Sequence, residues 1–200
     1  MVRPALEASK LTLYIAFLGT VLSIPPALVL AVLGARTTTP NVVVYQVSRS
    51  LLSFLRGVPE VVFALVFVTA VGLGPFPGVL ALLFHNVGVM GKLWSEAIET
   101  AEEGPVEALR VAGARRAQIV AHAVVPAVLP QFVGLLLYRF DVNVRASLVL
   151  GLVGAGGIGF LINQSIKLFQ FDVMLTQILV VLALVVVVDN LSAVLRKRVT

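Results

Sequence analysis

The residues best suited to chemistry in this sequence are four polar side chains inside an otherwise apolar stretch. They are Arg139, Asp141, Asn143 and Arg145. On a helix, Asp141 and Arg145 are four residues apart, so they share one face and can form an ion pair. Arg139 and Asn143 have the same spacing and share a second face. Two cations and an amide in an apolar setting indicate recognition of an anion or a buried polar contact between helices.

Ionisable groups within a membrane span are costly, by about 2.5–3.5 kcal/mol each on insertion scales, so they usually face a bundle interior or a cavity. One hypothesis is that Arg139 or Arg145, together with Asn143, lines a path and donates hydrogen bonds to an anionic solute, because a guanidinium binds two oxygens at once. In the alternative, Asp141 and Arg145 form a buried ion pair that fixes helix packing, and Arg139 extends to a membrane interface.

A glycine-rich run follows these residues. Its glycines are Gly151, Gly154, Gly156, Gly157 and Gly159. The run lacks the lysine and the Ser/Thr of a P-loop, and it does not follow a strand. Glycines in apolar surroundings more often permit close helix approach or a break in a membrane helix. We therefore expect a broken, partly re-entrant segment near the outer face, close to a gate.

Few other residues could do chemistry. The chain has no cysteine, which excludes disulfides, thiolate metal sites and cysteine nucleophiles. His85 and His122 are the only histidines, and neither has a carboxylate at ligand spacing, so we expect no metal site. His85 is expected to hydrogen-bond between helices. No Ser-His-Asp order or pair of catalytic carboxylates is visible, and the chain is not expected to be an enzyme.

Composition indicates which elements must position these residues. The chain is 59% hydrophobic and 12% charged, with a mean hydropathy of +1.04. A soluble domain carries about 25% charged residues, so this is an integral membrane protein. The net charge of +5 does not indicate nucleic-acid binding, because the basic residues form short clusters beside apolar spans and are typical of topology determinants.

The apolar stretches predict an all-α fold of about five membrane spans. They cover residues 11–33, 58–73, 78–98, 124 to beyond 138, and 173–188. Pro25-Pro26 should kink the first span. The second is short unless residues 50–55 extend it. An odd number of spans places the two ends of the chain on opposite sides of the membrane.

Basic residues orient the spans, because short cytoplasmic loops carry the excess of Lys and Arg. The first loop, the third loop and the C-terminal tail are the basic ones: Arg36, Arg49, Arg56, Arg110, Arg115, Arg116, Arg196, Lys197 and Arg198. We therefore place these three segments in the cytoplasm, and the N-terminus and the turn at residues 72–77 outside. The acidic run within residues 96–103 then lies at the cytoplasmic end of the third span, where we expect a solvated face.

The cytoplasmic segment at residues 99–126 has clear helix signals. Gly104-Pro105 predicts a helix start, with proline at the first helical position. Glu107 falls in the first turn, where a carboxylate favours the helix dipole. Gly113 permits a sharp break, and a second short helix at residues 115–124 leads to Pro126. The two helices should form a compact knob.

In order and spacing, Glu107-Ala108-Leu109, Gly113 and Pro126 resemble the motif of ABC importer permeases, with Leu109 in place of its second alanine. The resemblance implies that this segment is the coupling helix that docks into a groove of an ATPase. The residues that it assigns to coupling are Glu107, Ala108, Leu109, Arg110, Gly113, Ala114, Arg115, Arg116 and Pro126. An ordinary amphipathic linker between spans is the alternative.

Within that family, the run from Tyr138 to Arg145 and the segment at residues 56–60 are similar to the phosphonate permease branch. The glycine run also occurs in methionine-type permeases. The resemblance implies a phosphonate, phosphite or phosphate ester as cargo, with methionine as the second candidate; a passive channel or membrane scaffold is the alternative from another class. Phosphonate permeases are commonly longer, with an additional N-terminal span.

The resemblance also implies partners and location. Residues 1–200 would form a single permease domain that includes the coupling region at 99–126. Two ATPase subunits would bind ATP and Mg²⁺, and this chain itself would bind no cofactor. A periplasmic or lipoprotein solute-binding protein would dock outside, and the permease would be a homodimer in contact with membrane lipid, in the bacterial inner membrane. No nucleic-acid partner is expected.

Overall fold

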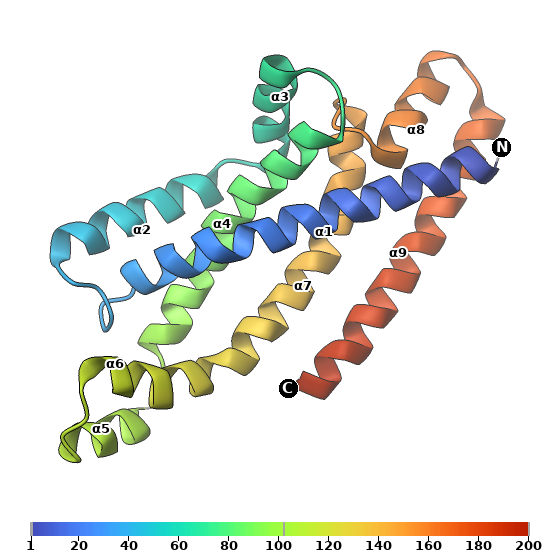
Figure 1. The fold of residues 1–200 in the computed structure, drawn as a ribbon. Helices are drawn as coiled ribbons and strands as arrows, with labels where there is room; N and C mark the ends of the chain where they lie inside the picture. The colour runs from blue at the N-terminus through green and yellow to red at the C-terminus, as the bar shows by residue number, and fades with distance from the viewer. Residues whose placement is uncertain (1, 102, 200) are drawn as a thin grey trace.

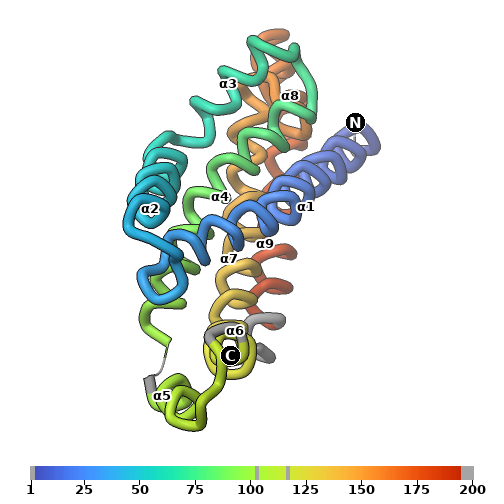
Figure 2. The backbone as a smooth tube through the Cα atoms, turned by 60° about the vertical axis from the view of Figure 1, so that its left-hand side comes forward, coloured from blue at the N-terminus to red at the C-terminus, as the bar shows by residue number. Residues whose placement is uncertain are grey.

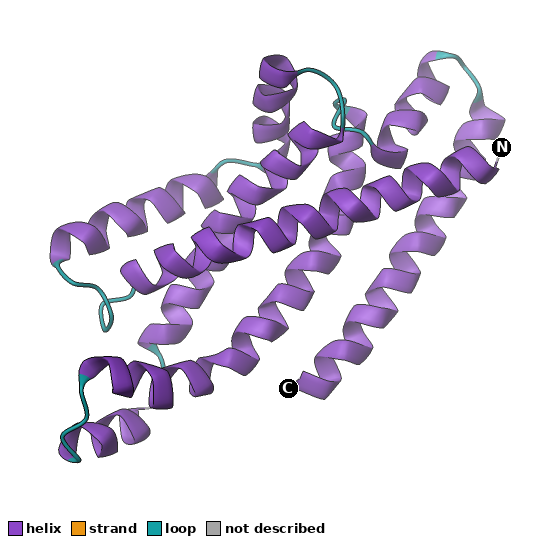
Figure 3. Cartoon of the chain, viewed as in Figure 1, coloured by secondary structure: helices purple, strands orange, loops and turns teal. Residues whose placement is uncertain are grey.

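The computed structural model describes residues 2–101 and 103–199, without the side chains of residues 2, 103, 116, 117 and 195–199. Every regular element in this part of the chain is a helix (Figure 3). In chain order the helices are α1 (Val2–Leu33), α2 (Val42–Gly57), α3 (Glu60–Val71), α4 (Pro75–Glu99), α5 (Glu103–Val111), α6 (Arg116–Ile119), the π-helical turn η1 (Val120–Val124), α7 (Val125–Leu152), α8 (Gly157–Lys167) and α9 (Phe171–Val199).

Four stretches of described helix are long and apolar enough to cross a membrane, and a bent helix pair brings the number to five. The four are residues 3–33, 75–99, 120–167 and 171–194. The fifth combines α2 and α3, which meet at 86°. The predicted second span at residues 58–73 is therefore long enough only with the residues before it, and these extend it across a sharp bend. Pro59 lacks an N–H donor and forces Val58 into an extended conformation, with φ −87° and ψ 121°, so the helix breaks there.

Helix α1 crosses the face of α4 and α7 and packs most extensively against α4 (Figure 1). Small side chains allow this approach: Ala16, Ala27 and Ala31 are fully buried. The helix begins at Val2, well before the predicted start at residue 11, and continues through Pro25-Pro26 without a break. The kink expected at the two prolines stays a prediction.

The cytoplasmic segment differs from the predicted pair of short helices. Helix α5 and the break at Gly113, where φ is +79°, are as expected. The second helix does not end at residue 124, however, but passes through η1 directly into α7. Pro126 cannot donate a backbone hydrogen bond, and the Val125 N–H bonds to the Val120 carbonyl five residues earlier. Helices α6, η1 and α7 are thus one continuous element, whereas α5 is separated from them by the break at Gly113.

The ends of the helices sort into two groups (Figures 1 and 2). The α1–α2 connection, α5, α6 and the last turns of α9 lie toward one end of the molecule. The start of α1 and the α3–α4, α7–α8 and α8–α9 connections lie toward the other. This grouping matches the sidedness inferred from the basic residues, with the first group in the cytoplasm.

Candidate functional site

A buried polar network joins three helices at the centre of the bundle. Arg139 on α7 is 8% exposed, and its Nε and Nη2 donate to the Asn86 Oδ1 on α4 at 3.1 and 2.7 Å. Nη2 also donates to the Asn143 Oδ1 at 3.4 Å, and Asn143 Nδ2 donates to the Thr20 Oγ1 on α1 at 2.7 Å. Arg139 therefore does not extend to a membrane interface. Arg139 joins α7 to α4 through hydrogen bonds, and Asn143 joins α7 to α1.

This network predicts a stability effect for Arg139→Leu. The substitution removes the donors to Asn86, whose own Nδ2 already has no hydrogen-bond partner among the described residues. An unpaired buried polar group costs roughly 1–3 kcal/mol, so we expect the free energy of unfolding to fall by about 2 kcal/mol. Thermal unfolding of the purified protein in detergent measures it. Arg56→Leu is the control, because Arg56 is exposed. Equal melting of both variants would contradict the structural role.

The predicted Asp141–Arg145 ion pair is confirmed, with Arg145 Nη2 donating to Asp141 Oδ2. Its two members differ in environment. Asp141 is 2% exposed, whereas the Arg145 side chain is 48% exposed. The structure therefore separates two arginines that the sequence could not distinguish. Arg139 and Asn143 are enclosed by helices, and Arg145 opens onto the surface of α7.

Two further polar residues lie on that surface, and the sequence interpretation had not assigned them to the site. Gln131 and Tyr138 are exposed and precede Arg145 at intervals of seven residues. Seven residues are close to two helical turns, so all three side chains project on one face. We name Gln131, Tyr138 and Arg145 the α7 open face. The seven-residue spacing was the available signal.

The glycine run forms the expected break between α7 and α8. Gly154, Gly156 and Gly157 have φ of +98°, +80° and +74°, which L-residues rarely adopt. The Ile158 N–H donates to the Thr12 Oγ1 of α1 at 2.9 Å, and the Gly154 carbonyl accepts from Gly74 N in the α3–α4 connection at 3.0 Å. The break is therefore packed against two other segments at the outer end.

At two positions beside that break, Gly151 and Gly159, glycine is needed because the backbones approach closely, and not because of an unusual backbone angle. A Cβ on Gly151 would lie 2.6 Å from the Gly156 carbonyl oxygen and 2.8 Å from the Gly159 Cα. Both distances are shorter than van der Waals contact, so the two segments approach through their bare backbones. All five predicted glycines thus take part in the break, and the proposed gate remains a functional prediction.

The cytoplasmic elbow, residues 103–119, presents apolar side chains to solvent. Val111, the last residue of α5, is 84% exposed, and Ala108 one turn earlier and Ala112 directly after the helix are also exposed. Exposed apolar surface on a soluble segment marks an interaction site. A shallow pocket of about 390 Å³ adjoins this face and is lined by Leu109, Ala112, Gly113, Ala114, Gln118 and His122. The elbow can therefore receive or fill a partner's surface.

The charged residues of the predicted coupling set are placed around this face. Glu107 and Arg110 line a second cavity of about 300 Å³ enclosed by α5, the α1–α2 connection, the end of α4 and the α6–η1 segment. Arg115 is exposed, and its N–H donates to the Gln118 Oε1 at 2.8 Å. The Arg116 side chain lies outside the described residues, and Pro126 is at the start of α7.

The acidic run at the end of α4 is not simply a solvated face. Glu99 accepts from the Arg36 backbone N–H at 2.8 Å and pairs with Arg49 at 3.4 Å. Arg36 Nε donates to the Tyr45 hydroxyl, and this hydrogen bond raises the pKa of Arg36, which stays charged. Lys92 pairs with Glu96 at 3.3 Å. The contacts of Glu99 join the end of α4 to the α1–α2 connection and to α2, whereas the Lys92–Glu96 pair lies within α4.

His85 makes the interhelical contacts expected of it. Its Nδ1 lies 3.1 Å from the Val58 carbonyl oxygen, and its Nε2 lies 3.6 Å from a Glu60 carboxylate oxygen at the start of α3. Sequence spacing gave no sign of this carboxylate, because it is brought in by the bend between α2 and α3. Among the described side chains, His, Cys, Asp and Glu form no group of three that could hold a metal ion.

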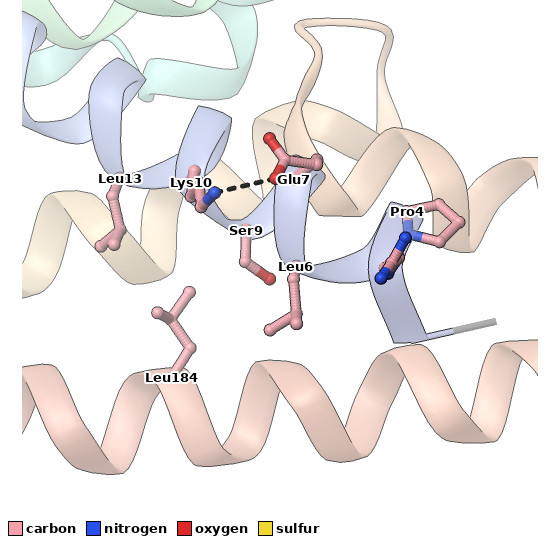
Figure 4. A pocket seen from close by; sticks show the side chains of 8 residues that line it. Pro4, Leu6, Glu7, Ser9, Lys10, Leu13 and Leu184 are labelled. Carbon is pink, nitrogen blue, oxygen red and sulfur yellow. Dashed lines mark hydrogen bonds and ion pairs between the residues drawn. The ribbon is translucent and has the colours of Figure 1, made fainter.

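A separate pocket of about 610 Å³ opens at the other end of the molecule, between the start of α1 and Leu184 of α9 (Figure 4). Its charged pair, Lys10 and Glu7, is joined by a 2.8 Å bond, and both side chains are exposed. Leu6, Leu13 and Leu184 supply an apolar wall. Separated by most of α1 from the elbow, the pocket takes no part in the coupling region.

The fold, the buried polar network around Arg139 and the exposed apolar side chains of the cytoplasmic elbow define a multi-pass membrane protein. Residues 12–200 match the family described as the binding-protein-dependent transport system inner membrane component. The chain belongs to this family. It is an ABC importer permease subunit of the inner membrane and not an enzyme, and as a family member it works with an ATPase and a solute-binding protein.

Relatives and solved structures agree with this assignment. The chain is 47% identical over 197 residues to the phosphite transport system permease protein PtxC of Stutzerimonas stutzeri, covering 98% of this chain and 70% of the relative. It is 40% identical over 186 residues to the phosphate-import permease protein PhnE of Mycolicibacterium smegmatis, covering 93% of this chain and 35% of the relative. The fold is similar to that of an inward-facing MetNI methionine ABC transporter, with TM-score 0.75, 23% identity and coverage of 100% and 96%. The fold is also similar to that of an amino acid ABC transporter, with TM-score 0.81 and 18% identity, covering 97% of this chain and 93% of the other.

Proposed function

We propose that this permease moves phosphite, a phosphonate or a related phosphorus oxyanion into the cell. The proposal rests on the named relatives at 40–47% identity and on one observation in the chain itself, the half-exposed Arg145 on α7. A guanidinium presents paired N–H donors that suit the oxygens of such an anion. Of Arg139, Asn143 and Arg145, only Arg145 is accessible to a solute, and Arg139 and Asn143 support the helix that carries it.

We further propose how the subunit is driven. Two copies form a homodimer with the path at their two-fold axis, and each elbow docks on one ATPase subunit. ATP and Mg²⁺ bind to the ATPase, and this chain needs no cofactor of its own. The exposed Ala108, Val111 and Ala112 support docking at the elbow. Because α6, η1 and α7 are continuous, a rigid-body movement that α5 passes to α6 across the break at Gly113 is carried along one helix to Arg145.

Methionine is the second candidate cargo. The likeness to the methionine transporter, at 23% identity, is one of fold. A zwitterionic amino acid does not account for Arg145 on an open helix face as directly as an oxyanion does. A passive channel has no use for an elbow attached to the membrane helix. Neither alternative is supported by a specific contact in the described residues.

The proposed function is tested by uptake into liposomes. The permease is purified with its ATPase and solute-binding protein, reconstituted with ATP inside, and supplied with labelled phosphite, a phosphonate, phosphate or methionine. We expect ATP-dependent accumulation of a phosphorus oxyanion and none of methionine. Accumulation of methionine alone, or of all solutes without ATP, would overturn the proposal. Omission of the binding protein is the control.

A further inference from the structure

We propose that the α7 open face lines the anion path, and that Asp141 holds Arg145 when no anion is present and yields it when one arrives. This inference rests on the proposed function and adds three things to it. It places Gln131 and Tyr138 on the path, and it distinguishes Arg145 from Arg139. It also proposes that Asp141 competes with the cargo for Arg145.

The face is defined by exposure along α7. From residue 132 to residue 151 the helix is covered, apart from Tyr138, Arg145 and Val149. Gln131 is exposed two turns before Tyr138. At 1.5 Å per residue, Gln131 and Arg145 are roughly 21 Å apart along the axis, which is most of the hydrocarbon thickness of a membrane. Polar side chains spread over that length can contact a solute along most of its way across the membrane.

The chemistry of this face indicates water rather than lipid. The exposed face of α9 shows what this protein presents to hydrocarbon, namely Leu175, Leu179, Leu182 and Val186. Between residues 131 and 145 of α7 the exposed positions carry an amide, a phenol and a guanidinium, whereas exposed apolar residues lie nearer the two ends of that helix. Ionisable side chains within spans face a cavity or a path rather than lipid. Direct packing against the same face of a second copy would bring two Arg145 side chains together, which like charge disfavours unless an anion lies between them.

The geometry of the ion pair supports exchange. Asp141 is buried and held by the bundle, whereas the Arg145 side chain is half exposed and bonded to Asp141 through Nη2. An incoming oxyanion offers the same type of acceptor as the carboxylate, and Arg145 can turn toward it from the surface of α7. Asp141 is buried and keeps its position, so Arg145 pairs with it again when the anion leaves. The cargo is thereby bound briefly rather than tightly.

The absence of cysteine from this sequence gives a direct test of the path, because a single introduced thiol is the only one in this chain. The unsubstituted complex, treated in parallel, shows any reaction of partner thiols. Tyr138→Cys and Arg145→Cys are prepared in the full complex and treated with a membrane-impermeant anionic thiosulfonate, at rest and during turnover. We expect both thiols to react, and phosphite to slow the reaction of Tyr138→Cys, which keeps Arg145. The control is Leu179→Cys on α9, equally exposed and expected to stay unmodified. Modification of Leu179→Cys alone, or of none of the α7 thiols in either state, would overturn the placement.

Uptake kinetics test the exchange. Arg145→Gln is expected to lower phosphite uptake at low concentration at least about tenfold, with part of the loss restored in Arg145→Lys. Asp141→Asn leaves Arg145 without its competitor, so KM and the maximal rate should both fall. Thermal unfolding shows whether each variant is folded. If the wild-type complex takes up no oxyanion, the proposed function fails. If it does and Asp141→Asn leaves KM unchanged or raises it, the exchange fails alone.

Discussion

Val111→Asp is expected to abolish coupled transport while leaving the permease folded. Val111 is 84% exposed on the cytoplasmic elbow, so a carboxylate there meets water in the isolated subunit and disturbs no packing. In the complex we expect the same side chain to be covered by the ATPase. A carboxylate buried in an apolar contact without a partner is strongly unfavourable. Losses at central interface residues reach about 2–4 kcal/mol, which corresponds to roughly 30- to 1000-fold weaker docking.

The measurement has two parts. Co-purification with the ATPase reports docking, and ATP-dependent uptake in liposomes reports coupling. Gln170→Asp is the matched control, because it places the same new charge on an exposed residue in the α8–α9 connection, at the end opposite the elbow. Val111→Ile should preserve docking, because it keeps an apolar surface. Normal co-purification of Val111→Asp would show that this face of α5 does not meet the ATPase, and the proposed coupling site would be wrong.

Gly159→Ala is expected to disrupt the outer end of the bundle. A Cβ at this position would collide with the Leu148 carbonyl oxygen and lie 3.0 Å from the Gly151 Cα. Both neighbours are backbone atoms of α7, so no side chain can rotate away and α8 has to move. Overpacking of a core typically costs about 1–3 kcal/mol, and a clash with fixed backbone on this scale belongs at or above the top of that range. The displaced helix would also pull the Ile158 N–H from Thr12.

Thermal unfolding in detergent, together with uptake in liposomes, measures this effect. We expect a lower Tm and loss of uptake in Gly159→Ala. Gly57→Ala is the matched control, because a Cβ there meets nothing within 4 Å and the residue lies at the end of helix α2. Retention of both stability and uptake in Gly159→Ala would mean that α7 and α8 separate readily, contrary to the tight contact in the structure.

Much of this protein follows from local sequence alone. Apolar length determined the spans, because a membrane requires every backbone N–H and C=O to be satisfied within a helix. Gly104-Pro105 and Gly113 marked the start and end of α5 within one or two residues. The pairing of Asp141 with Arg145 was also predictable, because residues four apart on a helix are neighbours whatever surrounds them. The motif around Glu107 identified the family before any contact was known.

For other features, the local sequence indicates a change in structure, but packing against residues distant in the sequence decides its form. Pro59 breaks the helix locally, but the 86° bend between α2 and α3 depends on how α3 packs against α4 and α7. Pro126 was read as the end of a short helix, whereas packing keeps the chain helical through a π-helical turn. Glu99 was expected to face solvent and instead pairs with Arg49, which lies 50 residues away in the sequence.

Only the tertiary structure decided which arginine is available to a solute. Arg139 and Arg145 are of the same type, lie six residues apart on one helix and have similar local surroundings in the sequence. Arg139 is enclosed because Asn86, 53 residues away, meets it from α4, and Asn143 is enclosed because Thr20, 123 residues away, meets it from α1. Contacts at such separations depend on how helices cross, which helical periodicity does not specify.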